Sequence, residues 1–320
     1  MTLKQLENDF KIKGYLKSKD LKIGDGKKPG TLTISGHIVV EYEDAQGNLN
    51  QHRISLFASD TTNAGTENKM FAGYKTILDQ FVSVDDVLAK QGKREDADFI
   101  EVVGELSGND YVSSKTNALI SSTEIRGRFV NRIKDVSDRT GSAIGNIGVV
   151  VDSFIDEMNT EGEPTGRKHV RAYSVGYGER VQELQNLVVG EDVAEAFESM
   201  YYPGASGVIT IEPRHFATTA TVENSGEQVG FGKQMERAVT NWTNELFVTG
   251  GYNPWEDEAA VSEEDFILIK EKRKADLAAK AAQTPKQNIN PQQGFGTKTE
   301  QQSSFGKPAT VQISEEDLPF

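Results

Sequence analysis

Residues 67–81, ENKMFAGYKTILDQF, form a helical pattern between runs of strand-forming residues. Five apolar side chains recur at the spacing of one helix face: Met70, Phe71, Tyr74, Ile77 and Leu78. Strand patterns precede this helix at 34–40 and 53–58 and follow it at 99–106 and 119–130, separated by turns rich in Gly and Pro. The order of strands, helix and strands fits the five-stranded OB barrel, although other small barrels and sandwiches fit the same string.

The next 120 or so residues repeat this element order. Strand patterns cover 146–155 and 169–178, a long helical pattern covers 181–200, and a further strand pattern covers 207–212. Repetition of a whole unit indicates two related domains in tandem. We therefore predict a mainly β (α+β) fold of tandem OB-like small barrels, the first in residues 1–137 and the second in residues 138–255.

A third segment, residues 256–283, is predicted to be helical. Ser262 is placed to cap the helix, with Asp265 three residues later in the manner of a capping box, and the helix should continue to about Gln283. The helix could close the second domain as a solvated surface element, or it could serve a partner protein.

Residues 284–320 have the composition of a disordered tail. Gln, Asn, Gly, Pro, Ser and Thr dominate as far as residue 313, and such a segment buries too little apolar surface to offset chain entropy. The tail ends in an acidic tip: Glu315, Glu316, Asp317, Leu318, Pro319 and Phe320. The tip offers a ring for an apolar pocket, a terminal carboxylate for a basic group and an acidic run for a cationic surface.

This tip resembles the C-terminus of the bacterial single-stranded DNA-binding proteins, which end in an acidic run, a hydrophobic residue, Pro and Phe, and some phage counterparts are similar. The resemblance implies a protein that coats single-stranded DNA in replication, recombination or repair and recruits partner proteins by inserting Phe320 into an apolar pocket. It also implies that the tail competes with DNA for the protein's own basic groove. The body departs from the bacterial pattern of one small barrel per chain, which puts the usual homotetramer in doubt and points to a phage or other divergent version.

The overall composition limits the other possibilities. The chain has no Cys, so disulfides and thiolate metal sites are excluded, and we expect no metal and no cofactor. No secretory signal or long apolar run occurs, so we expect a soluble protein in the cytoplasm of a bacterium or of a phage-infected cell. The net charge is −14, but residues 1–137 carry 19 Lys and Arg against 20 Asp and Glu, so the basic groups are concentrated there.

Two strand patterns nominate side chains for DNA contact. In residues 52–59 Arg53 and Phe57 lie opposite an aliphatic face, and in residues 169–178 Arg171, Tyr173 and Tyr177 do the same. Exposed rings of this kind would stack on bases while cations follow the phosphates. Trp242 is assigned instead to packing or a turn.

Basic residues supply the candidate phosphate contacts. They form a group near the N-terminus and another near the end of the first domain, which we expect to meet in one groove if the first and last strands are neighbours: Lys11, Lys13, Lys17, Lys19, Lys22, Lys27, Lys28, Arg126, Arg128 and Arg132. A glycine-flanked loop adds one ring and one cation, Phe231 and Lys233.

No catalytic constellation stands out, and we predict that the protein is not an enzyme. The four histidines show no paired metal-ligand spacing. An alternative is an adaptor whose acidic body does not hold DNA and whose tip mimics the signal of a single-stranded DNA-binding protein. A weaker alternative is a nucleic-acid enzyme with an accessory tip.

Overall fold

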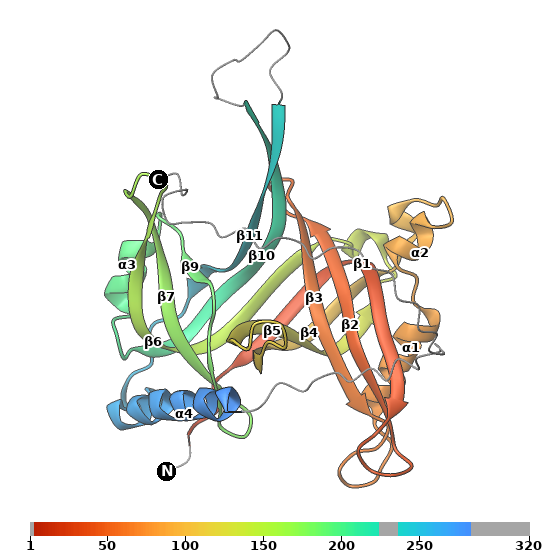
Figure 1. Cartoon of the computed structure of the whole chain (residues 1–320), viewed down its shortest axis with the longest axis horizontal. Helices are drawn as coiled ribbons and strands as arrows, with labels where there is room; N and C mark the ends of the chain where they lie inside the picture. Colours follow the sequence, from red (N-terminus) through yellow and green to blue (C-terminus); the bar gives the residue numbers. More distant parts are fainter. Residues whose placement is uncertain (1–2, 224–235, 283–320) are drawn as a thin grey trace, which may run out of the picture. The chain divides into compact units, whose positions relative to one another are not determined.

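The computed structural model describes residues 3–223 and 236–282, and its strands form one eleven-stranded sheet (Figure 1). The first barrel contains these elements in chain order: β1 (Asn8–Asp25), β2 (Leu32–Glu43), β3 (Leu49–Ser59), α1 (Lys69–Gln80), α2 (Val84–Leu88), η1 (Arg94–Asp96), β4 (Phe99–Val112) and β5 (Leu119–Arg132). The sheet closes because β1 pairs with β2 through its second half and with β4 through its first half. Between them, β2 pairs with β3, β3 pairs in parallel with β5, and β5 pairs with β4.

This strand order is that of the OB barrel, with α1 placed between the third and fourth strands. The helix predicted at 67–81 is confirmed as α1. It begins where the Asn68 side chain accepts a hydrogen bond from the backbone N–H of Met70. Tyr74 is buried beneath the helix and donates to the backbone oxygen of Gly127 at 2.8 Å, which ties the helix to β5.

The second barrel repeats the same closure. Its elements follow the short η2 (Val136–Asp138): β6 (Ser142–Met158), β7 (Pro164–Gly176), β8 (Arg180–Glu183), β9 (Leu187–Val189), α3 (Ala194–Met200), β10 (Ser206–Glu223) and β11 (Glu236–Gly251). Here β6 pairs with β7 and β10, and β9 pairs in parallel with β11, as β3 does with β5. The prediction of tandem OB-like barrels in a mainly β chain is therefore confirmed.

The long helix predicted over 181–200 is wrong. Only its last part is helical, as α3, while β8 and β9 occupy the first part. Asn186 takes a positive φ of 59°, which ends any continuous helix there. Leu187, Val188 and Val189 then pair with both β7 and β11, so tertiary strand pairing overrides the helical spacing.

The two barrels are joined by antiparallel pairing of β1 with β6, from Asn8 opposite Ile147 to Lys13 opposite Ser142. The Asn8 side chain extends the neighbouring β1–β4 ladder. Its amide donates to the backbone oxygen of Leu106 and its oxygen accepts from the Leu106 N–H, both at 2.8 Å. Both barrels belong to one compact unit.

Helix α4 (Glu263–Ala281) follows η3 (Asp257–Ala259) and confirms the predicted helical segment, with the Ser262 side chain accepting from the Asp265 N–H. It lies across the second barrel (Figure 1), where Ile269 packs with Tyr173 and Val175. Its Arg273, 4% exposed, reaches the first barrel and donates to both carboxylate oxygens of Asp110 at 2.5 and 2.9 Å. One helix therefore contacts both barrels.

The predicted tail, residues 284–320 with the tip, lies outside the described residues, as do Phe231 and Lys233. Within the described ranges, no helix combines the length and the apolar character needed to cross a bilayer.

Replacing Arg273 with Met should lower the free energy of unfolding by about 3 kcal/mol, because Asp110 is left partly buried without its cation. The midpoint of urea unfolding measures this loss, and Lys274→Met on the exposed side of α4 is the control, with an expected change within about 0.5 kcal/mol. Adding Asp110→Leu to Arg273→Met should recover part of the stability. An equal loss in the Lys274 and Arg273 variants would contradict a role for this ion pair in holding α4 to the first barrel.

Candidate nucleic-acid interface

The outer side of β1, β2 and β3 in the first barrel is uncovered, and we call it the open face. Phe57 is 62% exposed there, while Ile54, Leu56 and Ala58 point into the core, as their alternation predicts. Register places Lys22 opposite Ser35, and Ser35 opposite Phe57. Because directly paired residues share a side of the sheet, a cation and a ring lie in one row across three strands.

Arg53 lies two pleats along β3 from Phe57 on the same open face. Its guanidinium donates to Nδ1 of His37 at 3.2 Å, and since Arg has no acceptor, Nδ1 must be the accepting nitrogen. Burial, and next the Arg53 charge, lower the pKa of His37, so the ring is neutral at pH 7. Arg126, paired with Ser55 across the β3–β5 junction, extends this positive surface.

Lys27 and Lys28 lie in the turn between β1 and β2, which is closed by a hydrogen bond from the Gly26 N–H to the Thr31 oxygen at 2.7 Å. Both side chains are exposed at the end of the strands that form the open face. Six of the nominated residues thus belong to one surface: Lys22, Lys27, Lys28, Arg53, Phe57 and Arg126.

The equivalent face of the second barrel is covered, and the expectation that Tyr173 lies on an open face is wrong. Tyr173 is 5% exposed and packs with Leu3 and Leu6 of the N-terminal segment and Ile269 of α4. These elements come from both ends of the described chain, so strand alternation alone could not reveal the cover. Arg171 stays exposed but donates to Glu183 at 2.8 Å, while Tyr177 is exposed at the β7–β8 turn.

The nomination of Lys19 for DNA contact is also wrong, because its ammonium donates hydrogen bonds within the protein. It donates to the backbone oxygens of Leu78 at 3.0 Å and of Phe81, at the C-terminal end of α1. Those carbonyls lack helical partners, and a cation there is favourable. Lys17 is paired with Asp85, so both lysines hold the region of α1 and α2 against β1.

The predicted single groove between the two basic groups is wrong in its topology, because β4 lies between β1 and β5. Lys11 and Lys13 share Glu101 on β4, at 3.8 and 3.6 Å. Arg132 pairs with Asp98 at 2.6 Å, and Arg128 reaches Asp9 at 3.2 Å. Acidic side chains therefore lie between these cations and pair with them.

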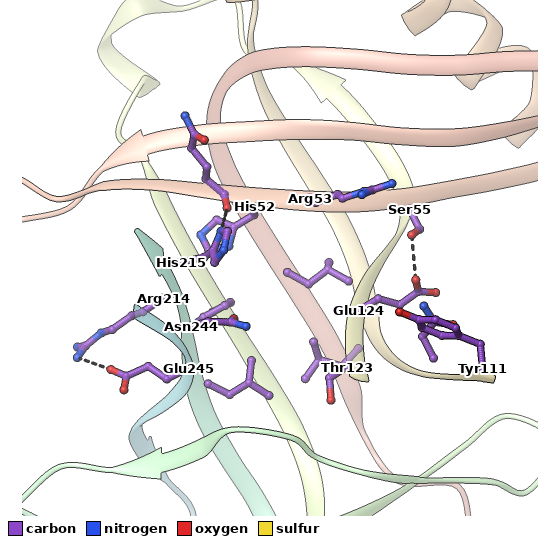
Figure 2. A pocket seen from close by; sticks show the side chains of 16 residues that line it. His52, Arg53, Ser55, Tyr111, Thr123, Glu124, Arg214, His215, Asn244 and Glu245 are labelled. Carbon is purple, nitrogen blue, oxygen red and sulfur yellow. Dashed lines mark hydrogen bonds and ion pairs between the residues drawn. The ribbon is translucent and has the colours of Figure 1, made fainter. Parts of the chain in front are cut away.

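A pocket of about 420 Å³ lies where the two barrels meet (Figure 2). Strands β3 and β5 pair only at Ile54 with Ile125 and at Ser55 with Arg126, and beyond this point they part. The β10–β11 hairpin of the second barrel contacts β3 beside this gap. The His215 N–H donates to the Asn50 side chain at 3.0 Å, and its Nδ1 donates to the Gln51 oxygen at 2.7 Å.

Sequence reasoning missed two features of this region. Trp242 is 66% exposed and stacks on His215 with 5.6 Å between ring centroids, so it is a surface ring rather than a packing residue. The register places Ala217 opposite Trp242 and Asn244 opposite His215, so the two rings lie on paired strands. The sequence could have revealed this contact only if β11 had been recognised as a strand.

His52 is the second missed feature. Its ring is 3% exposed, stacks on Tyr42 and lines the pocket. Burial lowers the pKa of His52 to about 3, so the ring is neutral at pH 7. Across residues 3–223 and 236–282, no group of three or more His, Cys, Asp or Glu side chains could hold a metal ion.

Comparison with known proteins gives a matching family model and similarity to solved structures. The model of the YorF family matches residues 7–284. No curated protein matches the chain. The wild-type single-stranded DNA-binding protein from Thermus aquaticus is similar over 82% of this chain and 99% of that chain, at 12% identity and a TM-score of 0.46. A deletion mutant of that protein is similar over 79% and 97%, at 13% identity and a TM-score of 0.42. The barrels are assigned from the strand order of this chain, not from these likenesses.

Alanine at positions 57 and 173 should separate the surface ring from the core ring. Phe57→Ala is expected to change the free energy of unfolding by about 0.5 kcal/mol or less, whereas Tyr173→Ala should cost about 3 kcal/mol or more through the cavity it leaves. Urea unfolding followed by circular dichroism measures both. If Tyr173→Ala proves as mild as Phe57→Ala, the cover formed by α4 and the N-terminal segment is not tightly packed.

Lowering the pH from 7 to 5 should destabilise the protein through His52. The unfolded imidazole takes up a proton near pH 6.5 while the buried one does not, so stability is present above pH 6.5 and is lost as the pH falls. One such group contributes about 2 kcal/mol over this range. Urea unfolding at each pH should show a shallower dependence of stability on pH in His52→Gln than in the wild-type chain. An unchanged slope in His52→Gln would contradict a buried neutral ring.

Proposed function

The chain belongs to the YorF family, and from the geometry of its barrels we propose that it binds single-stranded DNA without sequence preference. The observation that carries the proposal is the open face of the first barrel, with Phe57, Arg53 and Lys22 uncovered on β1–β3. The face of an OB barrel formed by its second and third strands, with the adjoining loops, is the usual site for oligonucleotides. The proposal includes roles in replication, recombination or repair, in a bacterial or phage-infected cytoplasm.

Stacking is the first interaction that this face offers. Each base stacked on a ring contributes roughly 1–3 kcal/mol, and every base has a face to offer, so such binding tolerates any sequence. Trp242 adds a second exposed ring on the neighbouring hairpin. The two rings flank the meeting point of the barrels, since Arg53 on the open face and His215 beneath Trp242 both line the pocket.

Phosphate contacts come from the cations of the same face and its turn. Lys22 is within 3.4 Å of Asp20, but an exposed pair of this kind contributes only about 0–1 kcal/mol, so a phosphate can replace the carboxylate. Lys27 and Lys28 extend the cationic surface beyond the strands. With a net charge of −14 on the whole chain, attraction must be local, and it should weaken steeply with salt.

We also propose that the acidic tip, residues 315–320, recruits replication or repair proteins. Support comes from its residues alone: Phe320 supplies a ring and a carboxylate, and Glu315 to Asp317 supply the charges for a basic surface. Binding and recruitment require no catalytic step, and we propose none.

The second candidate is the adaptor that carries the tip but holds no DNA. Its support is the pairing of nominated cations with carboxylates, as for Lys11 and Lys13 with Glu101 and Lys17 with Asp85. The open face has no role in this alternative, so a single binding experiment distinguishes the two.

Fluorescence titration of labelled oligo-dT at two salt concentrations tests the proposal. Full-length protein should bind saturably and more weakly at higher salt, and a chain ending at Gln283 should bind as tightly or more tightly because the acidic tail no longer competes. Phe57→Ala should weaken binding about 5- to 150-fold, the equivalent of roughly 1–3 kcal/mol.

Phe129→Ala is the matched control, because Phe129 is 57% exposed on β5 outside the open face, and its affinity should stay at the wild-type value. Absence of binding by wild type at low salt would overturn the proposal and favour the adaptor. An equal loss in both phenylalanine variants would contradict the assignment to the open face.

A further inference from the structure

The pocket between the barrels has the size of a small-ligand site and is partly open to solvent. Its volume of about 420 Å³ falls within the range of roughly 300–1,000 Å³ that is typical of such sites. Strands from both barrels supply its walls: β3, β4 and β5 from the first, and β10 and β11 from the second (Figure 2). The pocket exists only because the two barrels share one sheet.

One buried polar atom at this pocket has no partner in the described structure. Nε2 of His52 is inaccessible to solvent and makes no hydrogen bond there. Leaving a buried polar group unpaired costs about 1–3 kcal/mol, so an arrangement of this kind points to a partner that is not part of the protein. The neighbouring Asn50 differs, because its side chain is bonded to Asp44 and His215.

The uncharged part of the lining includes buried apolar side chains and side-chain amides. Leu106, Ile125 and Leu246 are each at most 8% exposed and form apolar wall. Asn109 and Asn244 add two side-chain amides to the lining. Tyr111 contributes a half-exposed ring to the same lining (Figure 2).

Three charged side chains of the lining, Glu124, Arg214 and Glu245, already have partners. Arg214 lies 3.0 Å from Glu212 and 3.6 Å from Glu245, and Glu245 also pairs with Arg167. Glu124 accepts from Ser55 at 3.1 Å and lies 3.5 Å from Arg126. Arg53, bonded to the neutral His37, is the lining cation without a carboxylate partner among the described residues. The other free groups are neutral donors and acceptors beside an apolar wall, which suits a planar ring whose phosphate stays near Arg53 at the mouth.

The open face leads directly to this pocket along β3. Arg53 belongs to both, since it lines the pocket and shares the outer side of β3 with Phe57. Four residues of a strand span about 13 Å, so a base stacked on Phe57 and the mouth of the pocket are a short step apart for a nucleic-acid strand.

We propose that the pocket takes one unstacked nucleobase from a single strand bound on the open face. The base edge meets the amides of Asn109 and Asn244 and, once the buried His52 ring turns toward the pocket, its Nε2. The base ring lies over the apolar wall with Tyr111 in the same lining. This inference rests on the proposed function and deepens it, because it gives the strand a direction from the first barrel toward the β10–β11 hairpin.

Nuclear magnetic resonance of the imidazole nitrogens tests the inference in the wild-type chain, which has four histidines and hence few signals. On saturation with oligo-dT, the His52 signals should shift, and the exposed His169 on β7 should not. Photocrosslinking with an oligonucleotide of 5-iododeoxyuridine should label Tyr111 or His215 in addition to the open face.

The matched variants are Asn244→Phe, which fills the pocket, and Asn241→Phe, which places the same side chain on β11 outside it. Asn244→Phe should weaken oligo-dT binding about 5- to 20-fold and abolish the His52 shift, while Asn241→Phe should preserve both. The wild-type spectrum decides the matter even if Asn244→Phe does not fold.

The possible failures are distinguishable. Oligo-dT binding that depends on Phe57 but leaves His52 unmoved overturns the pocket while the proposed function stands. Absence of oligo-dT binding at low salt overturns both.

Discussion

The pairing of β1 with β6 is the interaction on which the rest of the structure depends. The stretch Phe10–Lys13 is hydrogen-bonded on one side to β4 and on the other to β6. The strand that closes the first barrel is therefore also paired with the first strand of the second barrel. Gly145 is needed at this seam, because a Cβ there would lie 2.3 Å from the Phe10 ring. Two barrels joined in this way cannot rotate freely, and their junction holds the β10–β11 hairpin against β3.

That shared sheet also explains why two barrels of the same topology present different surfaces. The N-terminal segment and α4 both lie on the second barrel, where Leu6, Tyr173 and Ile269 form an apolar cluster. Arg273 of α4 then forms an ion pair with Asp110 of the first barrel. The cover stabilises the seam from outside and closes one face, so the face of the first barrel is the open one of the pair. The second barrel contributes to the proposed site through its hairpin instead.

Charge is distributed to match this division of roles. Several cations are held by carboxylates or by the carbonyls at the end of α1, where they support the fold. On the open face Arg53 is bonded to a neutral His37, and this contact does not cancel its charge. A chain with a net charge of −14 therefore keeps, within its described residues, a cation without a carboxylate partner on one surface, where a nucleic-acid backbone would need it.

The sequence by itself determined what depends on short spacing. Period-two alternation placed Phe57 outside and Ile54 inside, helical spacing located α1, and Ser262 marked the start of α4, because each signal involves residues within one or two turns or pleats. Tyr173 obeys the same alternation as Phe57, yet it is buried. Only the tertiary structure decided that Tyr173 is buried, that Lys19 caps α1 and that a pocket forms at His52. Each of these depends on contacts between segments far apart in the chain, and such contacts produce no periodic pattern in the local sequence.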